Sequence, residues 1–256
     1  MIESNASPFT GKGSYYGGKG ASGVAQAIIN QQPRHNLYIE PFAGAASIYF
    51  KKKAASCTAL YEKDVRTYAV LQSKIEDIKG RLPTLSNSCG MDALRALHTV
   101  AKISPYDDRC SVLIYCDPPY LMESRKTSIK RYGTEWEESD HVELLNILKK
   151  LGKQDGIHIQ LSCYPNDLYA KHLIGWKHID FTAMTRQGPV TERLYMNYDI
   201  EYYDLHDTSY IGKDYRERAQ IKSSLQKLTS KYKSLSRRAK EAWLADIGLS
   251  DESLPF

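Results

Sequence analysis

A short apolar run followed directly by two prolines constrains this chain more than any other feature. Residues 111–114 are Ser-Val-Leu-Ile, and residues 115–120 are Tyr-Cys-Asp-Pro-Pro-Tyr. The run is short and followed by prolines, so it predicts a buried strand that ends at Cys116. Such a strand favours an open α/β sheet. Asp117 would then lie at the carboxyl end of the strand, where these sheets bind ligands.

Residues 117–120 offer a carboxylate, a stiff backbone and an aromatic ring in close succession. Pro118 and Pro119 fix the backbone and remove two amide donors, which leaves carbonyl groups to accept hydrogen bonds. Asp117 and the Pro118 carbonyl can each accept one hydrogen of an exocyclic amine, while Tyr120 stacks on the ring that carries the amine. A Pro-Pro turn that only caps a strand explains this segment, taken alone, about equally well.

A second strand-and-turn pattern lies upstream. Residues 37–40 predict a strand, a turn of small residues follows, and residues 47–50 begin a helix. Small residues let backbone amides approach a ligand, and the amino terminus of a helix favours a negative group. A strand over 57–61 ends at Glu62, which comes 18 residues after Gly44, where doubly wound folds bind ribose hydroxyls. The turn lacks the three-glycine pattern of dinucleotide enzymes, which disfavours a nicotinamide cofactor.

Together these segments resemble the DNA adenine N6-methyltransferases of the Dam type. Three elements carry the resemblance, in the order found in that family: Tyr-Tyr-Gly-Gly-Lys at 15–19, Glu-Pro-Phe-Ala-Gly at 40–44 and Asp-Pro-Pro-Tyr at 117–120. Residues 160–164 resemble the family's next strand, and 191–197 resemble a late strand of phage and prophage members. The match therefore spans residues 14–203.

The resemblance implies an α/β fold, a doubly wound Rossmann-like methyltransferase sheet with a small helical insertion and a basic C-terminal helix. The methyltransferase domain would cover residues 1–210 and the C-terminal helical segment 211–256. A DNA-recognition insertion would lie at about 80–109, much of it helical over 91–103. Because thirty residues leave little room for a separate recognition domain, we expect a short or relaxed target sequence.

The implied reaction transfers a methyl group from S-adenosylmethionine to the N6 amine of an adenine flipped out of duplex DNA. Asp117, Pro118 and Tyr120 would be the catalytic residues. The resemblance implies that S-adenosylmethionine contacts Asp117 and eight residues that precede it in the chain: Tyr15, Lys19, Pro41, Phe42, Ala43, Gly44, Ala45 and Glu62. Asp64 is an alternative ribose ligand, and Lys19 could instead be a solvated surface lysine. An RNA or another planar amine is the alternative substrate.

Positive charge is concentrated near the carboxyl terminus. The whole chain carries +5, whereas residues 211–241 hold ten Lys or Arg and three acids. Apolar residues recur there at helical spacing, which predicts one amphipathic helix with a basic outer face. That face could contact DNA phosphates through Lys227, Lys231, Arg237 and Arg238, or it could only solubilise the domain. A second basic cluster, in a loop after the Asp-Pro-Pro-Tyr segment, is also placed to contact phosphates: Arg125, Lys126, Lys130 and Arg131.

Cysteine usage and hydropathy exclude several other classes. The five cysteines have no metal-ligand spacing, so we expect no metal. Three of them, Cys57, Cys116 and Cys163, lie in or beside predicted strands and indicate reduced core residues. No stretch is apolar enough for a membrane span, and no signal-peptide pattern begins the chain. We therefore expect a cytoplasmic enzyme, and the family resemblance implies that the cell is a bacterium or a phage-infected host.

Overall fold

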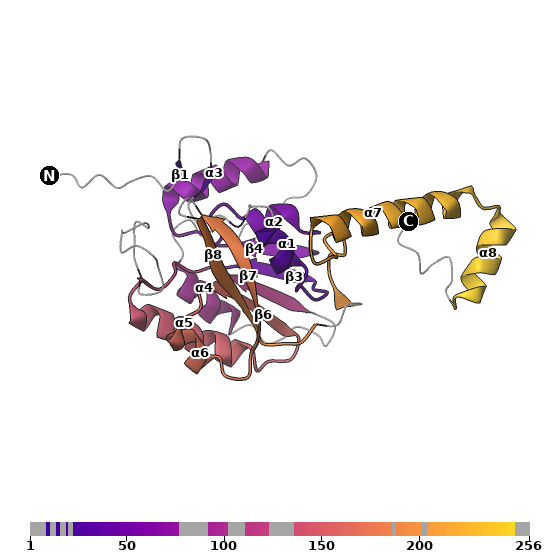
Figure 1. Ribbon diagram of the computed structural model, residues 1–256. Helices are drawn as coiled ribbons and strands as arrows, with labels where there is room; N and C mark the ends of the chain where they lie inside the picture. The colour runs from indigo at the N-terminus through magenta and orange to yellow at the C-terminus, as the bar shows by residue number, and fades with distance from the viewer. Residues whose placement is uncertain are drawn as a thin grey trace. The chain divides into compact units, whose positions relative to one another are not determined.

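The computed structural model describes residues 9–10, 14–15, 19, 23–76, 92–101, 111–122, 136–185, 188–200 and 204–248. The chain divides into two compact units, Met1–Asp207 and Thr208–Phe256. The first unit contains the sheet and the helices that cover it, and the described part of the second contains two helices (Figure 1). The candidate site lies in the first unit.

A six-stranded sheet forms the centre of the first unit, with strand order β4-β3-β5-β6-β8-β7. Its first four strands are parallel to one another, whereas β8 is antiparallel to both β6 and β7. The strands are β3 (Leu37–Glu40), β4 (Cys57–Leu60), β5 (Val112–Cys116), β6 (Ile157–Cys163), β7 (Lys177–Thr185) and β8 (Gly188–Met196). A separate antiparallel pair consists of β1 (Phe9–Thr10) and β2 (Ser14–Tyr15). This mixed α/β sheet confirms the predicted fold class.

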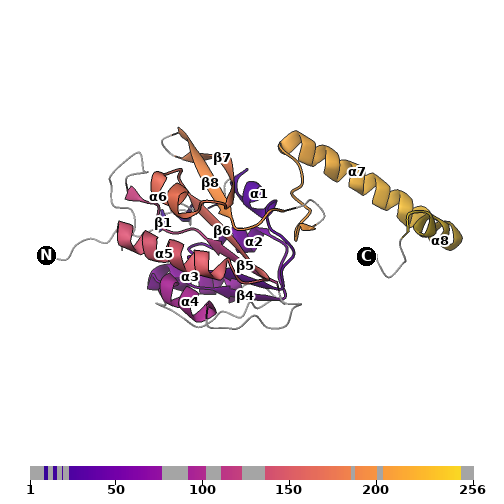
Figure 2. The same cartoon turned by 90° about the horizontal axis from the view of Figure 1, so that it is seen from below.

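Helices cover both faces of the sheet (Figures 1 and 2). They are α1 (Val24–Ile29), α2 (Ser47–Lys51), α3 (Val65–Glu76), α4 (Ala93–Val100), α5 (Glu138–Leu151) and α6 (Asp167–His172). The main core joins α4, α5 and α6 to the sheet, as when Leu145 and Tyr169 pack in one cluster with Ile114 and Ile159. A smaller cluster links the residues around α2 to α3.

β5 has the burial expected of a central parallel strand. Leu113, Ile114 and Cys116 are fully buried, because β3 and β6 flank the strand and helices cover the sheet. The strand predicted to end at Cys116 is therefore confirmed. The strands predicted at 37–40 and 57–61 are confirmed as β3 and β4, and the helix start predicted at 47–50 is confirmed as α2.

The interval predicted to hold the recognition insertion contains a core helix. Asp92 caps α4 by accepting a hydrogen bond from the Leu94 amide (2.9 Å). Ala96, Leu97 and Val100 are buried in the main cluster beside α5. This part of the interval therefore serves the fold. Residues 80–91 and 102–109 lie outside the described part of the chain.

The C-terminal segment differs from the single helix that the sequence predicts. It contains two helices, α7 (Tyr215–Ser234) and α8 (Arg237–Asp246). Leu235 takes an extended conformation, and the Ser236 hydroxyl accepts a hydrogen bond from the Ala239 amide (3.3 Å), which starts a new helix. Apolar periodicity continued across this break and so concealed it.

The cysteine prediction is wrong at one position. Cys116 and Cys163 are buried free thiols, but Cys57 is exposed because it is the first residue of β4, a strand at the edge of the sheet. Burial raises the pKa of the Cys116 and Cys163 thiols well above the usual value. Cys89 and Cys110 lie outside the described residues. Within the described part of the chain, no helix has the length and hydropathy needed to span a membrane.

Candidate functional site

The predicted site residues follow two neighbouring strands. β3 ends at Glu40 and leads into the small-residue turn, while β5 ends at Cys116 and leads into Asp117. β3 pairs with β4 on one side and with β5 on the other. This is a switch point of the sheet, and doubly wound folds bind ligands at the carboxyl ends of the strands there.

Backbone in the left-handed region shapes the turn after β3. Gly44 has a φ of 51°, and Ala46, the residue before α2, has a φ of 48°. A residue with a Cβ seldom takes this conformation, and such strain is concentrated at functional sites. The Ala43 amide donates to the Tyr61 carbonyl (2.9 Å), which ties the turn to the end of β4.

Glu62 fixes the same turn from the tip of β4. One carboxylate oxygen accepts a hydrogen bond from the Gly44 amide (2.7 Å) and the other from the Asp64 amide (2.8 Å). Burial raises the pKa of Glu62, and these amide hydrogen bonds oppose that rise. Asp64, the alternative ribose ligand, instead accepts hydrogen bonds from the amide and hydroxyl of Thr67 (both 2.8 Å). Its carboxylate therefore caps α3.

Glu40 is a buried carboxyl group for which the sequence suggested no role. It accepts hydrogen bonds from the Tyr38 hydroxyl and from the Tyr49 amide of α2. Burial raises the pKa of Glu40 to about 8, and these hydrogen bonds only partly offset the effect. Glu40 therefore links β3 to α2 beneath the turn.

Lys19 and Asp117 form a largely buried ion pair. Their Nζ and Oδ1 atoms are 2.9 Å apart, and the Lys19 side chain is only 7% exposed. The sequence-based alternative of a solvated surface lysine is therefore wrong. Burial raises the pKa of Asp117, while Lys19 acts in the opposite direction. Because 20% of the Asp117 side chain remains exposed, a ligand could still reach it.

Glu192 joins this pair from β8, and the sequence analysis assigned it no role. Its Oε2 atom lies 3.6 Å from Lys19 Nζ and accepts a hydrogen bond from the Tyr120 hydroxyl (3.2 Å). Glu192 is 6% exposed. A signal was present, because alternation along a strand puts Glu192 on the same face as the buried Leu194 and Met196.

Tyr120 is held between charged and aromatic neighbours. Lys19 Nζ lies 4.8 Å from the centre of the Tyr120 ring. Tyr164, which follows β6, packs edge-on against that ring with centroids 4.5 Å apart. Tyr164 is a second side chain at this site to which the sequence analysis gave no role. Residues from four segments of the first unit thus meet around Tyr120.

Among the other predicted residues, one is described by its backbone alone, four lie outside the described part of the chain and four belong to the second unit. Tyr15 belongs to β2, of which only the backbone is described. The loop residues lie outside the described part of the chain: Arg125, Lys126, Lys130 and Arg131. The C-terminal basic residues are exposed on α7 and α8: Lys227, Lys231, Arg237 and Arg238. Among the described residues, no group of His, Cys, Asp and Glu side chains could hold a metal ion.

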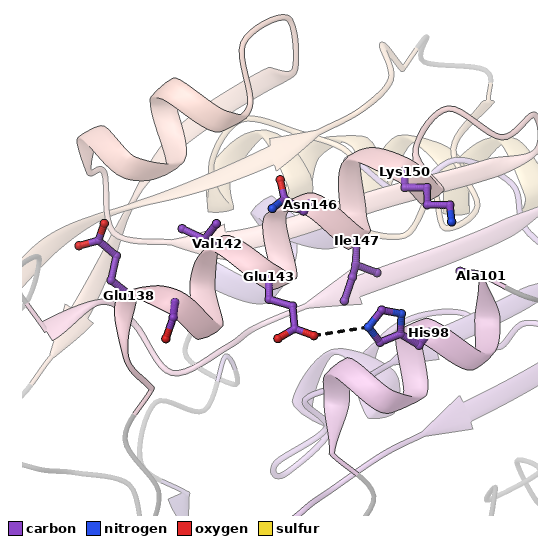
Figure 3. A pocket seen from close by; sticks show the side chains of 9 residues that line it. His98, Ala101, Glu138, Val142, Glu143, Asn146, Ile147 and Lys150 are labelled. Carbon is purple, nitrogen blue, oxygen red and sulfur yellow. Dashed lines mark hydrogen bonds and ion pairs between the residues drawn. The ribbon is translucent and has the colours of Figure 1, made fainter.

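A groove of about 620 Å³ lies elsewhere on the first unit, between α4 and α5. Figure 3 shows Glu143 of α5 directed toward His98 of α4 across this groove, and the two side chains are 3.4 Å apart. None of the predicted site residues lines the groove. It is therefore separate from the cluster around Asp117.

Residues 72–187 match the family model described as D12 class N6 adenine-specific DNA methyltransferase. The matched segment contains β5, the Asp-Pro-Pro-Tyr segment, α5 and β6. Among curated proteins, none matches the chain.

Several solved structures are similar at low sequence identity. A conserved hypothetical protein from Streptococcus pyogenes is 17% identical, with 70% of this chain and 96% of that chain covered and a TM-score of 0.44. An rRNA methylase from Streptococcus thermophilus is 9% identical, with coverages of 67% and 93% and a TM-score of 0.42. A SAM dependent methyltransferase from Agrobacterium tumefaciens is 14% identical, with coverages of 67% and 58% and a TM-score of 0.41.

Proposed function

We propose that this chain is a methyltransferase that methylates the N6 amine of a flipped-out adenine in DNA, because residues 72–187 match the family model of D12 class N6 adenine-specific DNA methyltransferases. The methyl donor is S-adenosylmethionine. The observation that carries the proposal is the buried cluster at the end of β5, where Lys19 pairs with Asp117 beside the Tyr120 ring. A carboxylate and an aromatic ring in this arrangement suit a planar base that carries an amine.

The residues around the turn after β3 suit the proposed cofactor. Glu62 already accepts two amide hydrogen bonds, but each carboxylate oxygen has two lone pairs, so it can still accept from ribose hydroxyls. The small side chains of residues 43–45 leave the backbone open to a ligand. In our proposal Tyr15, Lys19 and the backbone from Pro41 to Ala45 complete the cofactor site. Bound S-adenosylmethionine supplies a methyl group carried on a sulfonium.

Asp117 and Pro118 act on the adenine amine in this mechanism. The amine is a poor nucleophile because its lone pair is delocalised into the ring. By accepting both amine hydrogens, the Asp117 carboxylate and the Pro118 carbonyl draw the nitrogen toward tetrahedral geometry and localise the lone pair. The Lys19 ammonium opposes the rise in the Asp117 pKa that burial causes, and so favours the ionised carboxylate, which accepts hydrogen bonds.

Tyr120 forms a wall of the base pocket, and positioning supplies most of the acceleration. Attack by the nitrogen would form the nitrogen–methyl bond as the methyl–sulfur bond breaks, which leaves a neutral thioether and a positively charged nitrogen that must release one proton. Asp117 is placed to take that proton and pass it to solvent, because part of its side chain is exposed. The mechanism needs no nucleophilic side chain. The burial of Cys116 and Cys163, which keeps both thiols protonated, is consistent with this.

Basic residues would hold the DNA around the extruded base. We assign phosphate contacts to the loop after the Asp-Pro-Pro-Tyr segment, through Arg125, Lys126, Lys130 and Arg131, and to the exposed lysines and arginines of α7 and α8. Such contacts raise affinity without reading sequence. A short or relaxed target sequence remains part of the proposal.

The test is methyl transfer from labelled S-adenosylmethionine to duplex DNA, single-stranded DNA and RNA in parallel. We expect label in duplex DNA, recovered as N6-methyladenine after digestion to nucleosides. Asp117→Ala should reduce transfer by about a hundredfold or more and leave the protein folded, because Asp117 positions the amine. The exposed Asp155 provides a matched Asp155→Ala control with wild-type turnover. Label confined to RNA, or normal turnover of Asp117→Ala, would contradict the proposal.

A further inference from the structure

We propose that Glu192 is a positioning residue of the methyl-transfer site, which holds Lys19 and Tyr120 in place beside Asp117. This inference rests on the proposed function and extends it to β8, beyond the matched residues 72–187. Three observations support it. The Lys19 ammonium contacts both Asp117 and Glu192, the Tyr120 hydroxyl donates to Glu192, and the pairing of β6 with β8 brings Glu192 to the end of β6.

The Lys19 ammonium lies between two carboxylates. It is 2.9 Å from Asp117 Oδ1 and 3.6 Å from Glu192 Oε2, and the Lys19 and Glu192 side chains are 7% and 8% exposed. Charges this well removed from water interact strongly, and each needs a partner. Because the Lys19 ammonium also interacts with Glu192, it does not pair with Asp117 alone. Asp117 can therefore still accept a hydrogen bond from the adenine amine.

The Tyr120 ring is fixed at both ends. Its backbone follows Pro118 and Pro119, whose φ angles are locked by their rings. Its hydroxyl donates to Glu192 Oε2 (3.2 Å). Tyr164 packs edge-on against the ring between these two anchors. Asp117 also shares a side-chain hydrogen bond with Tyr120, so Glu192 and Asp117 together orient the ring against which a base would stack.

The antiparallel register explains how Glu192 reaches the site. In the ladder of β6 and β8, Cys163 pairs with Arg193 as the last partners. Glu192 precedes Arg193 in β8, so in the direction of β6 it lies one position beyond that pair, beside the point where β6 ends and Tyr164 follows. β5 and β6 are parallel, so their carboxyl ends lie together. Glu192 therefore meets the segment that begins at Asp117.

A glutamate here does more than a neutral acceptor could. To hold the Tyr120 hydroxyl, a glutamine side-chain carbonyl would be enough. To share the Lys19 ammonium with Asp117, a negative charge is needed, and burying that charge has a desolvation cost. Glu192→Gln removes the charge and keeps the shape, so it separates the two roles.

The experiment compares full-length Glu192→Gln, Glu192→Asp and Tyr120→Phe, and the Glu192→Gln/Tyr120→Phe double variant, with wild type. Glu143→Gln is the matched control, since Glu143 lines the separate groove. The readouts are kcat and KM for duplex DNA, the Kd for S-adenosylmethionine by calorimetry, and Tm. We expect Glu192→Gln to lower kcat about tenfold or more, with KM for DNA and Tm close to those of the control.

Glu192→Asp should recover part of the lost kcat, because it restores the charge. Tyr120→Phe should cost about the same in the Glu192→Gln background as in wild type, because glutamine keeps an acceptor for the Tyr120 hydroxyl and loses only the charge. Wild-type kcat in Glu192→Gln overturns the inference, as does a loss of kcat that only accompanies a loss of Tm. If wild type methylates no duplex DNA, the proposed function fails instead, and the inference fails with it.

Discussion

Glu40 shows how a single residue can carry a stability cost that changes with pH. Its carboxyl group is buried beneath the turn after β3, where it accepts hydrogen bonds from Tyr38 and Tyr49. Burial disfavours the charged form and raises the pKa to about 8 from an ordinary value of 4.5. Near neutral pH the folded chain therefore holds a proton that the unfolded chain has released.

This raised pKa predicts the direction of a pH effect. Glu40 contributes stability that is fully present below pH 4.5 and is lost as the pH rises toward 8, because only the unfolded state ionises in that window. Glu40→Gln removes the titration. The free energy of unfolding of the variant, relative to wild type, should therefore rise between pH 5 and pH 8, on the order of 1–3 kcal/mol.

Urea denaturation of both proteins at the two pH values measures this difference. The exposed Glu76→Gln is the control and should keep a constant difference from wild type, since the hydrogen-bond partner of Glu76 is the neutral Gln72. A Glu40→Gln difference that is the same at both pH values would show that Glu40 is ionised in the folded protein.

At the scale of elements, Glu62 and Asp64, the two acids that follow β4, stabilise different parts of the fold. Glu62 holds the turn after β3, and Asp64 caps α3 through Thr67. An N-cap carboxylate contributes about 1 kcal/mol to helix stability, whereas a charge-assisted hydrogen bond to a ligand contributes about 1.5–3 kcal/mol to its binding.

We therefore expect the two alanine variants to separate. Glu62→Ala should weaken S-adenosylmethionine binding by about 1.5–3 kcal/mol, whereas Asp64→Ala should mainly lower the free energy of unfolding by about 1 kcal/mol. Calorimetric titration and denaturant melts of both variants provide the comparison. If Asp64→Ala shows the larger loss of affinity, the ribose contact belongs to Asp64.

The elements that the sequence predicted are those with local signals. The apolar run before Asp117 and the small residues after Glu40 define strand ends within a few positions, and the structure confirms both. The break at Ser236 was missed because apolar spacing continued through it and the cap depends on one hydroxyl.

Contacts between segments far apart in the chain could not be predicted from local sequence patterns. Lys19 and Asp117 were each assigned to the cofactor, but their ion pair depends on how the chain returns to the end of β5. Glu192 looks like an ordinary strand residue, since only its burial and the antiparallel register of β8 reveal its partners. The fold, the turn after β3 and the Asp-Pro-Pro-Tyr segment were thus predictable, whereas the buried partner of Lys19 and Tyr120, Glu192, was not.

At the scale of the whole molecule, most of the net positive charge lies in the second unit, where residues 211–241 hold ten Lys or Arg and three acids. Neutralising Lys227, Lys231, Arg237 and Arg238 with glutamine should weaken DNA binding evenly across sequences. It should also reduce the slope of log affinity against log salt by about 0.9 for each phosphate that the protein no longer neutralises. Arg237 already pairs with Glu241 (2.8 Å), so its share should be the smallest.

Fluorescence anisotropy at several salt concentrations measures the slope. A control with the same number of charges removed replaces four exposed lysines of the first unit with glutamine: Lys149, Lys150, Lys153 and Lys171. It should change the slope less. An unchanged slope in the C-terminal variant would favour a segment that only solubilises the protein.

The two units differ sharply in how much side chain they bury. α7 contains no buried residue, and α8 contains one, Leu244. Helices without such packing depend on local backbone energetics, and helices of this length are marginal in water. On heating, the first unit should lose structure in one sharp calorimetric transition, while α7 and α8 fade gradually at lower temperature. If a polyanion binds these helices only in their folded form, its apparent affinity depends on the fraction of chains in which they are helical. Cooling raises that fraction, so the apparent affinity should increase on cooling.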